Sequence, residues 1–558
     1  MKLSIIGTSG ILPTQIEWNM LAIDHRVEFG DFGGWTSALY SSDDCAILWV
    51  VFLEDLFTPE LVEDLVEEKM KMNIVAVLEP LVYHLETSNQ PTLVAYSGWR
   101  QSSVISHARC EPAWNRLSCN FEITLKKLID QFSSLYIVDL DSVFAEHGLI
   151  NCFDSRNRYG FGCRLSSLGI SLLADSANRI LDRLGNSARK VLVVDCDDTL
   201  WGGVLGEVGI GGISLGTDGV GMAYRDIQRS IKRWTAEGVL LAIASKNDEE
   251  LVWTVFDDHP EMQFRRRDLT AWRVNWDNKA ANLIAIAKEL DLGLESFVFI
   301  DNSCFERQQM RQALPQVFVP ELPDDITAWP AFLDSMDALA QLQVSEDDRT
   351  KTELYKRRTA FVSGLTGADD IAGFLKSTGM QPEFLLLAPE NLARAEQLCQ
   401  KTNQFNLRTM RYTLAELSER GSDENCLSFL VSLTDRFGSH GMVGLVIAFL
   451  RGEAAFLDSF ILSCRVLGRH LEAWVLQELT AHLKSANCKW LLAEFLPTER
   501  NSVARSFLPD HGLAPLEWER LPSVHPVQNM RNRVSTTGLH FLTDLRTLEV
   551  PHLEVFES

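Results

Sequence analysis

The sequence has no paired cysteines and no long apolar runs. Its 11 cysteines are scattered through 558 residues, and none belongs to a CxxC pair. An odd and unclustered set of this kind favours reduced thiols over a disulfide framework. No stretch approaches the roughly 18 uncharged apolar residues that a membrane-spanning helix needs. The apolar run in the initial MKLSIIGTSG is too short for a signal peptide, so we expect a cytoplasmic protein.

Basic residues are scarce as well. The chain has 52 Lys and Arg against 76 Asp and Glu, which gives a formal net charge of −24. Nucleic acids and anionic membranes require surfaces rich in Lys and Arg, so neither is an expected partner. A local basic patch can still bind an acidic protein, and the run 265–267 (three arginines) is a candidate, although such runs are more often solvated surface.

The order of apolar runs and amphipathic segments predicts an α/β multidomain protein. In residues 1–187, apolar runs that are typical of strands alternate with helical patterns. Residues 188–345 repeat this alternation more clearly, which favours a Rossmann-like parallel sheet with helices on both faces. The mixed-charge segment SEDDRTKTELYKRR (345–358) marks a boundary, and residues 346–558 are expected to form an α+β domain.

The expected strands of the two flanking domains can be named by their letters. In the first domain they are SIIGTSG, CAILWVVFL, NIVAVLEPLVY (73–83), PTLVAYSG and SLYIVDLD. In the last domain they are PEFLLLA, CLSFLVSLTD, MVGLVIAFL and AAFLDSFILS, followed by the helix HLEAWVLQELTAHLKSAN. The apolar stripe of that helix is expected to pack into a core.

Polar side chains follow three apolar runs of the middle domain. They are Asp195, Asp197 and Thr199 at and after the run 191–195, Ser245 after the run 239–244, and Asp301 with Asn302 after the run 296–300; Lys279 begins a predicted helix. In an open parallel sheet, ligands bind at the carboxyl ends of the strands. We therefore expect these groups to lie at one edge of the sheet.

Clustered carboxylates repel one another, so a fold tolerates them only with a cation. Hard oxygen ligands of this kind select Mg²⁺, and Asp195, Asp197 and Asp301 are the predicted metal ligands. Such a pocket suits a phosphoryl group. Asp195 is the predicted nucleophile, which would form an aspartyl-phosphate. Asp197 would protonate the leaving oxygen and later deprotonate water.

Three further groups are expected to bind the phosphoryl oxygens: Thr199, Ser245 and Lys279. The alternative is that DCDD is only a turn or a helix cap, since short motifs recur by chance. The ordered series of polar groups at strand ends and at a helix start favours the catalytic interpretation.

The motifs of this region resemble those of the haloacid-dehalogenase superfamily of phosphotransferases. The words DCDDTLWGGVLGE, SKN, HPEM, NWDNKAAN and FIDN…ER resemble more narrowly its FkbH-like branch, subfamily IIIC. The family usually has a second Asp at the position of Asn302, where an amide removes one negative charge near the metal. The Gly-rich piece after the first motif is too short for a cap domain, so we expect a pocket open to a bulky or protein-bound substrate.

A second reactive group is expected in FLDSFILSCRVLGRHLEAW. Cys464 lies between a predicted strand and a helix, beside Arg465 and Arg469, and this setting lowers the pKa of a thiol. The alternative is a buried structural cysteine, a common fate of free Cys. The loop resembles the pyrophosphate loop of GNAT-type acyltransferases, in which a helix N-terminus binds phosphate, with the bulky His470 at a position that is usually small.

FkbH-like proteins also carry TNQFNLRT (402–409) and DRFGSHGMVG (435–444), and both motifs are present here. The resemblance therefore implies that Cys464 is the acyl-carrying thiol. His440 and His470 are candidate bases, although a lone histidine is more often a satisfied surface or core group. Cys196 lies between two acidic residues, which disfavour its thiolate, and it is the weaker candidate.

The segment SIIGTSG resembles the first block of SGNH hydrolases, in which Gly-Asp-Ser follows a strand. Ser9 has the nucleophile position, but Thr8 replaces the Asp, and the later FDSRNRYGFGCRLSSLG lacks a D-x-x-H. Without a histidine the serine is not activated. We therefore expect an SGNH-like domain that serves docking or capping and does not catalyse.

The resemblance to FkbH-like proteins implies a bifunctional enzyme. It would dephosphorylate D-1,3-bisphosphoglycerate and load the glyceryl group onto the phosphopantetheine thiol of an acyl carrier protein, for polyketide or tetronate biosynthesis. An acyl phosphate at C1 is an electrophile for a thiolate, and a phosphate ester at C3 needs a phosphatase. Two alternatives stay open, a plain Mg²⁺-dependent small-molecule phosphatase and a non-catalytic scaffold for carrier proteins.

Overall fold

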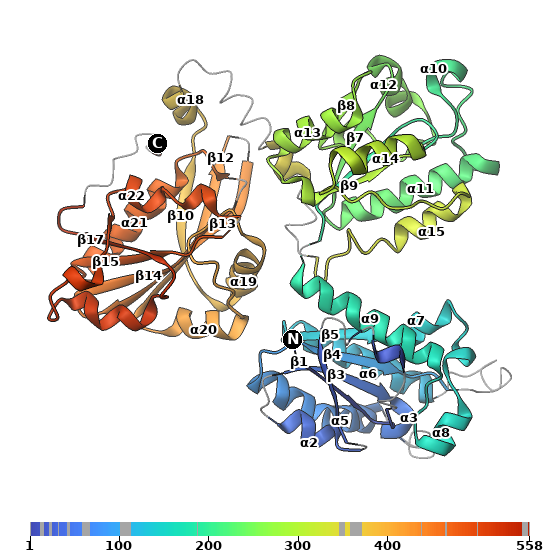
Figure 1. Cartoon of the computed structure of the whole chain (residues 1–558), viewed down its shortest axis with the longest axis horizontal. Helices are drawn as coiled ribbons and strands as arrows, with labels where there is room; N and C mark the ends of the chain where they lie inside the picture. The colour runs from blue at the N-terminus through green and yellow to red at the C-terminus, as the bar shows by residue number, and fades with distance from the viewer. Residues whose placement is uncertain are drawn as a thin grey trace. The chain divides into compact units, whose positions relative to one another are not determined.

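The protein divides into two compact units, Met1–Asn186 and Ser187–Ser558. The computed structural model describes residues 2–11, 16–19, 21, 25–31, 33–41, 45–57, 67–100, 113–186, 188–344, 352–357, 371–436, 438–463, 466–498, 500–548 and 556. These residues form three β-sheets, one in the first unit and two in the second (Figure 1). The predicted α/β multidomain class is thereby confirmed.

The first unit contains a five-stranded parallel sheet in the order β2-β1-β3-β4-β5. Its strands are β1 (Lys2–Gly7), β2 (Arg26–Phe29), β3 (Ala46–Phe52), β4 (Thr92–Ser97) and β5 (Leu135–Asp139). Its helices are η1 (Ile16–Trp18), α2 (Trp35–Tyr40), α3 (Leu53–Leu56), α5 (Glu67–Thr87), α6 (Ala113–Ile129), α7 (Leu140–Ala145), η3 (Leu149–Cys152), α8 (Ser155–Phe161) and α9 (Ser167–Gly185). Alternate residues of β3 pack against α5 and α6 on one face and against α7 and α9 on the other.

Helix α5 overturns one predicted strand. The run 73–83 belongs to this helix and not to a strand. The buried residues of α5 recur every three or four positions along one stripe: Met70, Ile74, Leu78, Leu81 and Leu85. A helix gathers these apolar side chains on one buried stripe, whereas an extended strand would have placed alternate ones on its second face.

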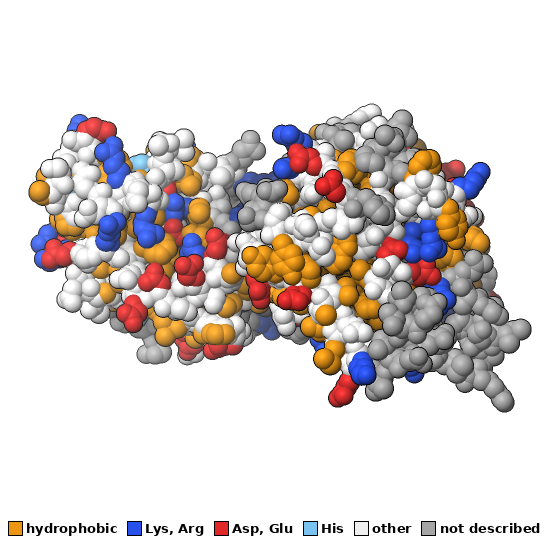
Figure 2. Space-filling model, turned by 90° about the horizontal axis from the view of Figure 1, so that it is seen from below, with side chains coloured by type: hydrophobic (Ala, Val, Ile, Leu, Met, Phe, Trp, Pro, Cys, Tyr) orange, Lys and Arg blue, Asp and Glu red, His pale blue; other side chains and the backbone are white. Residues whose placement is uncertain are grey.

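The surface carries charges of both signs. On the face shown in Figure 2, acidic and basic side chains are interspersed, and hydrophobic side chains gather near the middle of the view. The acidic excess therefore does not form one continuous patch on this face. Within the described ranges, every helix is too short or too polar to cross a lipid bilayer.

The second unit begins with a four-stranded parallel sheet in the order β8-β7-β6-β9. Its strands are β6 (Val191–Val194), β7 (Leu240–Ser245), β8 (Ala271–Val274) and β9 (Phe297–Ile300). Its helices are α10 (Leu205–Val208), α11 (Gly219–Ala236), α12 (Glu249–Asp258), η4 (Arg266–Asp268), α13 (Lys279–Leu290), η5 (Leu294–Ser296), α14 (Cys304–Ala313), η6 (Ile326–Ala328) and α15 (Trp329–Asp334). Three of these strands and the helices α11 and α13 confirm predictions, whereas the short β8 was not predicted.

The second unit also contains an eight-stranded mixed sheet in the order β10-β12-β13-β14-β15-β17-β16, with β11 paired to β14. Its strands are β10 (Gln381–Leu386), β11 (Phe405–Asn406), β12 (Cys426–Asp435), β13 (Gly438–Arg451), β14 (Ala454–Leu462), β15 (Trp490–Phe495), β16 (Ala514–Pro515) and β17 (Leu539–Asp544). Its helices are α18 (Ile371–Ser377), η7 (Pro389–Asn391), α19 (Leu392–Lys401), α20 (Leu414–Ser422), α21 (Leu471–Ser485), η9 (Ser502–Ala504), α22 (Phe507–Asp510), η10 (Trp518–Arg520) and η11 (Pro526–Arg533). Among the pairings between these strands, β14 with β15 is parallel, with α21 as the crossover.

Candidate functional site

The polar groups at the ends of β6, β7 and β9 meet at the carboxyl edge of the four-stranded sheet. Asp195 directly follows β6, Ser245 ends β7, and Asp301 directly follows β9. Since β6 pairs with both β7 and β9, its end lies between the other two. The predicted convergence of polar strand ends is therefore present in the fold.

Lys279 joins the two buried carboxylates of this edge. It is the first residue of α13, and its Nζ lies 3.0 Å from Asp195 Oδ2 and 2.6 Å from Asp301 Oδ2. Burial opposes the charge of Lys279, but the two carboxylates outweigh burial and raise the pKa of the ammonium group. Burial, and then the neighbouring charge of Asp195, raise the pKa of Asp301 to about 6. The three side chains thus form one buried cluster that is joined by two ion pairs.

One carboxylate oxygen of this cluster has no hydrogen-bond partner among the described residues. This atom is the buried Asp195 Oδ1, whereas Asp301 Oδ1 accepts a hydrogen bond from the N–H of Ser303 at 2.9 Å. A buried unsatisfied oxygen is costly unless a ligand satisfies it. Carboxylate oxygens are hard ligands, so Asp195 and Asp301 fit a magnesium ion. Within the described ranges, no set of three His, Cys, Asp or Glu side chains is arranged as a metal site.

Asp197 is held by a separate set of donors. Its Oδ1 accepts hydrogen bonds from Trp201 Nε1 at 2.9 Å and from the N–H of Leu205 at 3.2 Å. Its Oδ2 accepts one from Asn247 Nδ2 at 3.0 Å. Burial raises the pKa of Asp197, which suits a general acid. A metal-binding role for Asp197 stays a prediction.

The roles of Trp201 and Asn247 were not predicted. Both residues stand in motifs that the sequence offers, DCDDTLWGG and SKN, but nothing in the spacing shows that both side chains reach Asp197. The contact between Asn247 and Asp197 joins residues 50 positions apart, so it depends on the pairing of β6 with β7.

The remaining predicted groups at these strand ends are Thr199, Ser245 and Asn302, of which the first two are buried. Thr199 is buried, and its Oγ1 accepts a hydrogen bond from the N–H of Asn302 at 3.1 Å, which ties together the loops that follow β6 and β9. The side chain of Asn302 is exposed. Ser245 is buried and hydrogen-bonds to Cys196. Direct contact of Thr199 and Ser245 with phosphate stays a prediction.

The surroundings of Cys196 disfavour its thiolate, as predicted. Burial, followed by the charge of Asp195, raises its pKa well above the ordinary value. The thiolate is the nucleophilic form of cysteine, so this setting makes Cys196 a weaker candidate nucleophile than a cysteine with an ordinary pKa.

Two of the three arginines in the run 265–267 have partners within the second unit, and Arg266 and Arg267 are exposed. Arg265 Nη1 donates to the backbone carbonyls of Phe256, Met262 and Phe264. Arg266 pairs with Asp257 at 2.5 Å. The run lies between α12 and β8, where the chain enters a parallel strand, so it is at the opposite end of the sheet from Asp195. This arrangement does not favour the predicted docking role beside the catalytic motifs.

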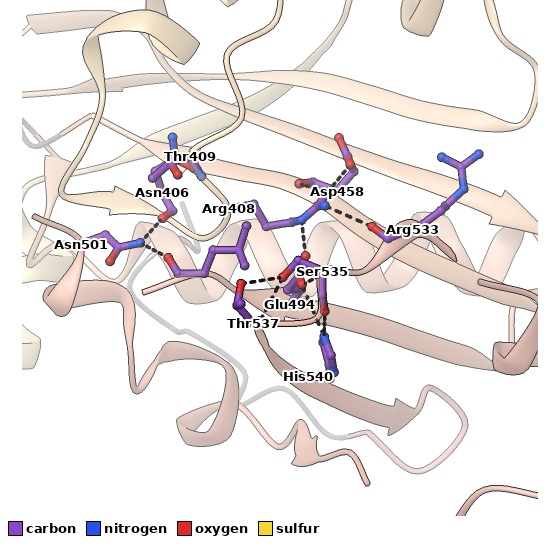
Figure 3. A network of polar contacts seen from close by, with 12 residues as sticks. Asn406, Arg408, Thr409, Asp458, Glu494, Asn501, Arg533, Ser535, Thr537 and His540 are labelled. Carbon is purple, nitrogen blue, oxygen red and sulfur yellow. Dashed lines mark hydrogen bonds and ion pairs between the residues drawn. The ribbon is translucent and has the colours of Figure 1, made fainter. Parts of the chain in front are cut away.

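The motif TNQFNLRT contributes to a buried ionic network of the eight-stranded sheet (Figure 3). Arg408 Nε donates to Glu494 Oε2 at 2.7 Å, and the Arg408 guanidinium also pairs with Asp458. Asp458 accepts a second hydrogen bond, from the hydroxyl of Tyr412. The last parallel pair of β14 and β15 is Leu457 with Ala493. Asp458 and Glu494 are therefore the first residues beyond the point where the two strands part.

The same motif fills the space between the diverging strands. Strand β11 pairs with the end of β14, and the N–H of Leu496 donates to Leu407 O at 2.8 Å. Asn501 Nδ2 donates to Asn406 O at 3.0 Å (Figure 3). Diverging strands leave backbone groups that an extended chain can pair with. Here the segment 405–408 of the chain itself takes that place.

The motif DRFGSHGMVG forms a second buried ionic group. His440 Nε2 lies 2.9 Å from Asp435 Oδ2, and Arg469 also pairs with Asp435. All three side chains are buried. The carboxylate of Asp435 therefore offsets the positive charge of Arg469. The predicted reactive Cys464 and its neighbour Arg465 lie outside the described residues.

Comparison with known proteins supports the fold. No protein-family model and no curated protein matches the sequence. Among solved structures, the N-terminal part of the protein BF1531 from Bacteroides fragilis, which contains a phosphatase domain complexed with Mg, is similar with a TM-score of 0.52 and 21% identity, over 60% of this chain and 93% of that one. The ribosomal-protein-S18-alanine N-acetyltransferase from Escherichia coli has a TM-score of 0.22 and 14% identity, over 30% of this chain and 94% of that one.

In the first unit, Ser9 hydrogen-bonds to a carboxylate among the described residues. Its hydroxyl donates to Asp55 Oδ2, and the hydroxyl of Thr8 donates to the same oxygen at 3.2 Å. Asp55 Oδ1 in turn accepts a hydrogen bond from Arg164 Nε at 2.9 Å. The hydroxyl of Ser9 thus binds a carboxylate that is also paired with Arg164, and the non-catalytic role of this unit stays a prediction.

Proposed function

We propose that this protein is a Mg²⁺-dependent phosphatase that also transfers a glyceryl group from D-1,3-bisphosphoglycerate to the phosphopantetheine thiol of an acyl carrier protein. The phosphatase part rests on the buried pair Asp195 and Asp301, which Lys279 joins at adjacent strand ends. Asp195 Oδ1 has no hydrogen-bond partner among the residues that the structure describes. The similar protein from Bacteroides fragilis contains a phosphatase domain complexed with Mg, which supports the same metal here.

Each residue then has a defined step. A carboxylate oxygen of Asp195 attacks phosphorus, and the bond from phosphorus to the leaving oxygen breaks as the new bond forms. Asp197, held by Asn247 and Trp201, gives its proton to the leaving oxygen. Asp197 next takes a proton from the water that attacks the aspartyl-phosphate, which releases phosphate and restores Asp195. Mg²⁺, when bound, supplies positive charge that offsets the crowded anions.

The phosphatase activity should depend on added magnesium. We expect the protein to release inorganic phosphate from 3-phosphoglycerate in the presence of Mg²⁺, and to lose at least about 100-fold in rate when a chelator removes the ion, because the anionic phosphoryl group and Asp195 then repel. A colorimetric phosphate assay measures this, and added Mg²⁺ should restore the rate. Equal rates with and without chelator would contradict the proposal.

The acyl-transfer part uses Cys464. The thiolate would attack the C1 carbonyl carbon of the acyl phosphate, and the bond from that carbon to the phosphate oxygen would break, which leaves a glyceryl thioester and free phosphate. The thiol of the carrier would then attack this thioester and regenerate Cys464. The self-paired segment 405–408 supports a donor other than coenzyme A, because it takes the place between β14 and β15 that an extended ligand would need.

Intact-mass spectrometry tests this step. Incubation with D-1,3-bisphosphoglycerate should add one glyceryl group to the wild-type protein and none to Cys464→Ala. The matched control is Cys119→Ala, which removes an exposed cysteine of α6 and should leave the adduct unchanged. An adduct that persists in Cys464→Ala would contradict the assignment. Phosphate release without any adduct would favour the plain phosphatase.

A further inference from the structure

A second lysine spans the catalytic edge. Lys246 directly follows β7, and Glu306 lies in the first turn of α14, after β9. Lys246 Nζ is 2.7 Å from Glu306 Oε1. Strand β6 lies between β7 and β9, and neighbouring strands are about 5 Å apart, so the two ends of this ion pair start about 10 Å apart. The pair therefore crosses over the end of β6, where Asp195 begins the catalytic loop.

The two partners differ in exposure. The side chain of Lys246 is 35% exposed, whereas that of Glu306 is 11% exposed. Glu306 Oε2 is buried and has no hydrogen-bond partner among the described residues. An ammonium group has three donors, and a single carboxylate oxygen engages one of them. The other N–H donors of Lys246 can thus bind an additional anion from the solvent side.

Lys246 also differs from the cation deeper in the site. Lys279 is buried and already contacts Asp195 and Asp301. It is suited to the phosphoryl group that reacts. Lys246 is attached one residue beyond Ser245 and reaches the solvent-facing side, where the rest of a bound substrate would extend.

We propose that Lys246 binds a second anionic group of the substrate, so that the site selects phosphate monoesters that also carry a carboxylate or a phosphate. This inference rests on the proposed phosphatase function and names the substrate class of the same site. In the empty site Glu306 neutralises Lys246. In the complex the second anion takes up the donors that face solvent, and the charge of Glu306 weakens the binding of that anion.

Two substrates that differ only at this second group test the inference. 3-Phosphoglycerate carries a carboxylate, and glycerol 3-phosphate carries a hydroxymethyl group in its place. We expect Lys246→Met to raise KM for 3-phosphoglycerate about 10- to 100-fold, the worth of one charge-assisted hydrogen bond, and to leave KM for glycerol 3-phosphate and kcat for both within about twofold. Glu306→Gln should lower KM for 3-phosphoglycerate a few-fold.

The matched control is Lys288→Met, which removes an exposed lysine in the last turn of α13. This variant should leave KM and kcat for both substrates unchanged. Equal effects of Lys246→Met on both substrates, or no effect on either, would overturn the inference. If the wild-type protein releases phosphate from neither compound, the proposed function fails instead. Isothermal titration calorimetry with the same two compounds and variants then decides the inference by binding alone: 3-phosphoglycerate should bind more weakly to Lys246→Met, and unchanged affinity would overturn it.

Discussion

Replacement of Asp195 by asparagine is expected to abolish phosphate release, with a fall in kcat of at least about 10,000-fold. The amide has nearly the shape of the carboxylate but no negative charge, so it cannot attack phosphorus. It also removes one of the two charges that hold Lys279. The loss should therefore appear in kcat under saturating 3-phosphoglycerate and Mg²⁺, measured by phosphate release.

The control for this variant is Asp324→Asn. Asp324 is an exposed residue outside the catalytic edge, and its replacement should leave kcat and KM unchanged. Circular dichroism of both variants should match the wild type, because neither change removes packed apolar atoms. Unchanged turnover in Asp195→Asn would remove the basis of the phosphatase proposal and would leave the scaffold as the better account.

Replacement of Arg408 by methionine is expected to destabilise the eight-stranded sheet by about 3–5 kcal/mol. Methionine keeps much of the apolar volume but leaves Asp458 and Glu494 as buried carboxylates without their cation. Removing one partner of a buried ion pair is costly because the remaining charge has lost its water as well as its partner. Differential scanning calorimetry should show the transition of this sheet shifted downward by several degrees.

Arg546 provides the matched comparison. It pairs with Asp544 at 2.5 Å on the surface of the same sheet, and its side chain is 57% exposed. Arg546→Met should leave the transition where it is, since water solvates the remaining carboxylate. If both variants shift the transition equally, burial is not what makes Arg408 important. Double replacement of Asp458 and Glu494 by their amides should recover part of the stability lost in Arg408→Met.

The sequence predicted the convergence of Asp195, Asp301 and Lys279 because its signals are local. Asp195 and Asp301 each follow a run of four apolar residues, and such runs form buried parallel strands. Once the strands are parallel, the positions of the polar groups at their carboxyl ends follow. The start of α13 at Lys279 was predicted from the helical pattern of the residues that follow.

Other features required contacts that sequence spacing does not encode. Strand β8, with the letters AWRV, is short, and an exposed Trp272 and a half-buried Arg273 separate its two buried residues, so its pattern is too weak to predict. The run 73–83 is apolar enough to suggest a strand, and only the three-to-four-residue spacing of its buried side chains identifies α5. The hydrogen bond from Asn247 to Asp197 depends on the lateral pairing of two strands, which no local pattern specifies.

The placement of Arg408 has a practical consequence for dividing the chain. The residue precedes β12 by 18 positions and yet supplies the counter-charge between β14 and β15. A shortened protein that starts at β12 would contain most of the strands of the sheet. It would lack Arg408, whose positive charge neutralises the buried carboxylates of Asp458 and Glu494. We therefore expect that an independently folding C-terminal fragment must begin upstream of residue 405, and that one cut between Arg408 and β12 is recovered mainly as aggregate.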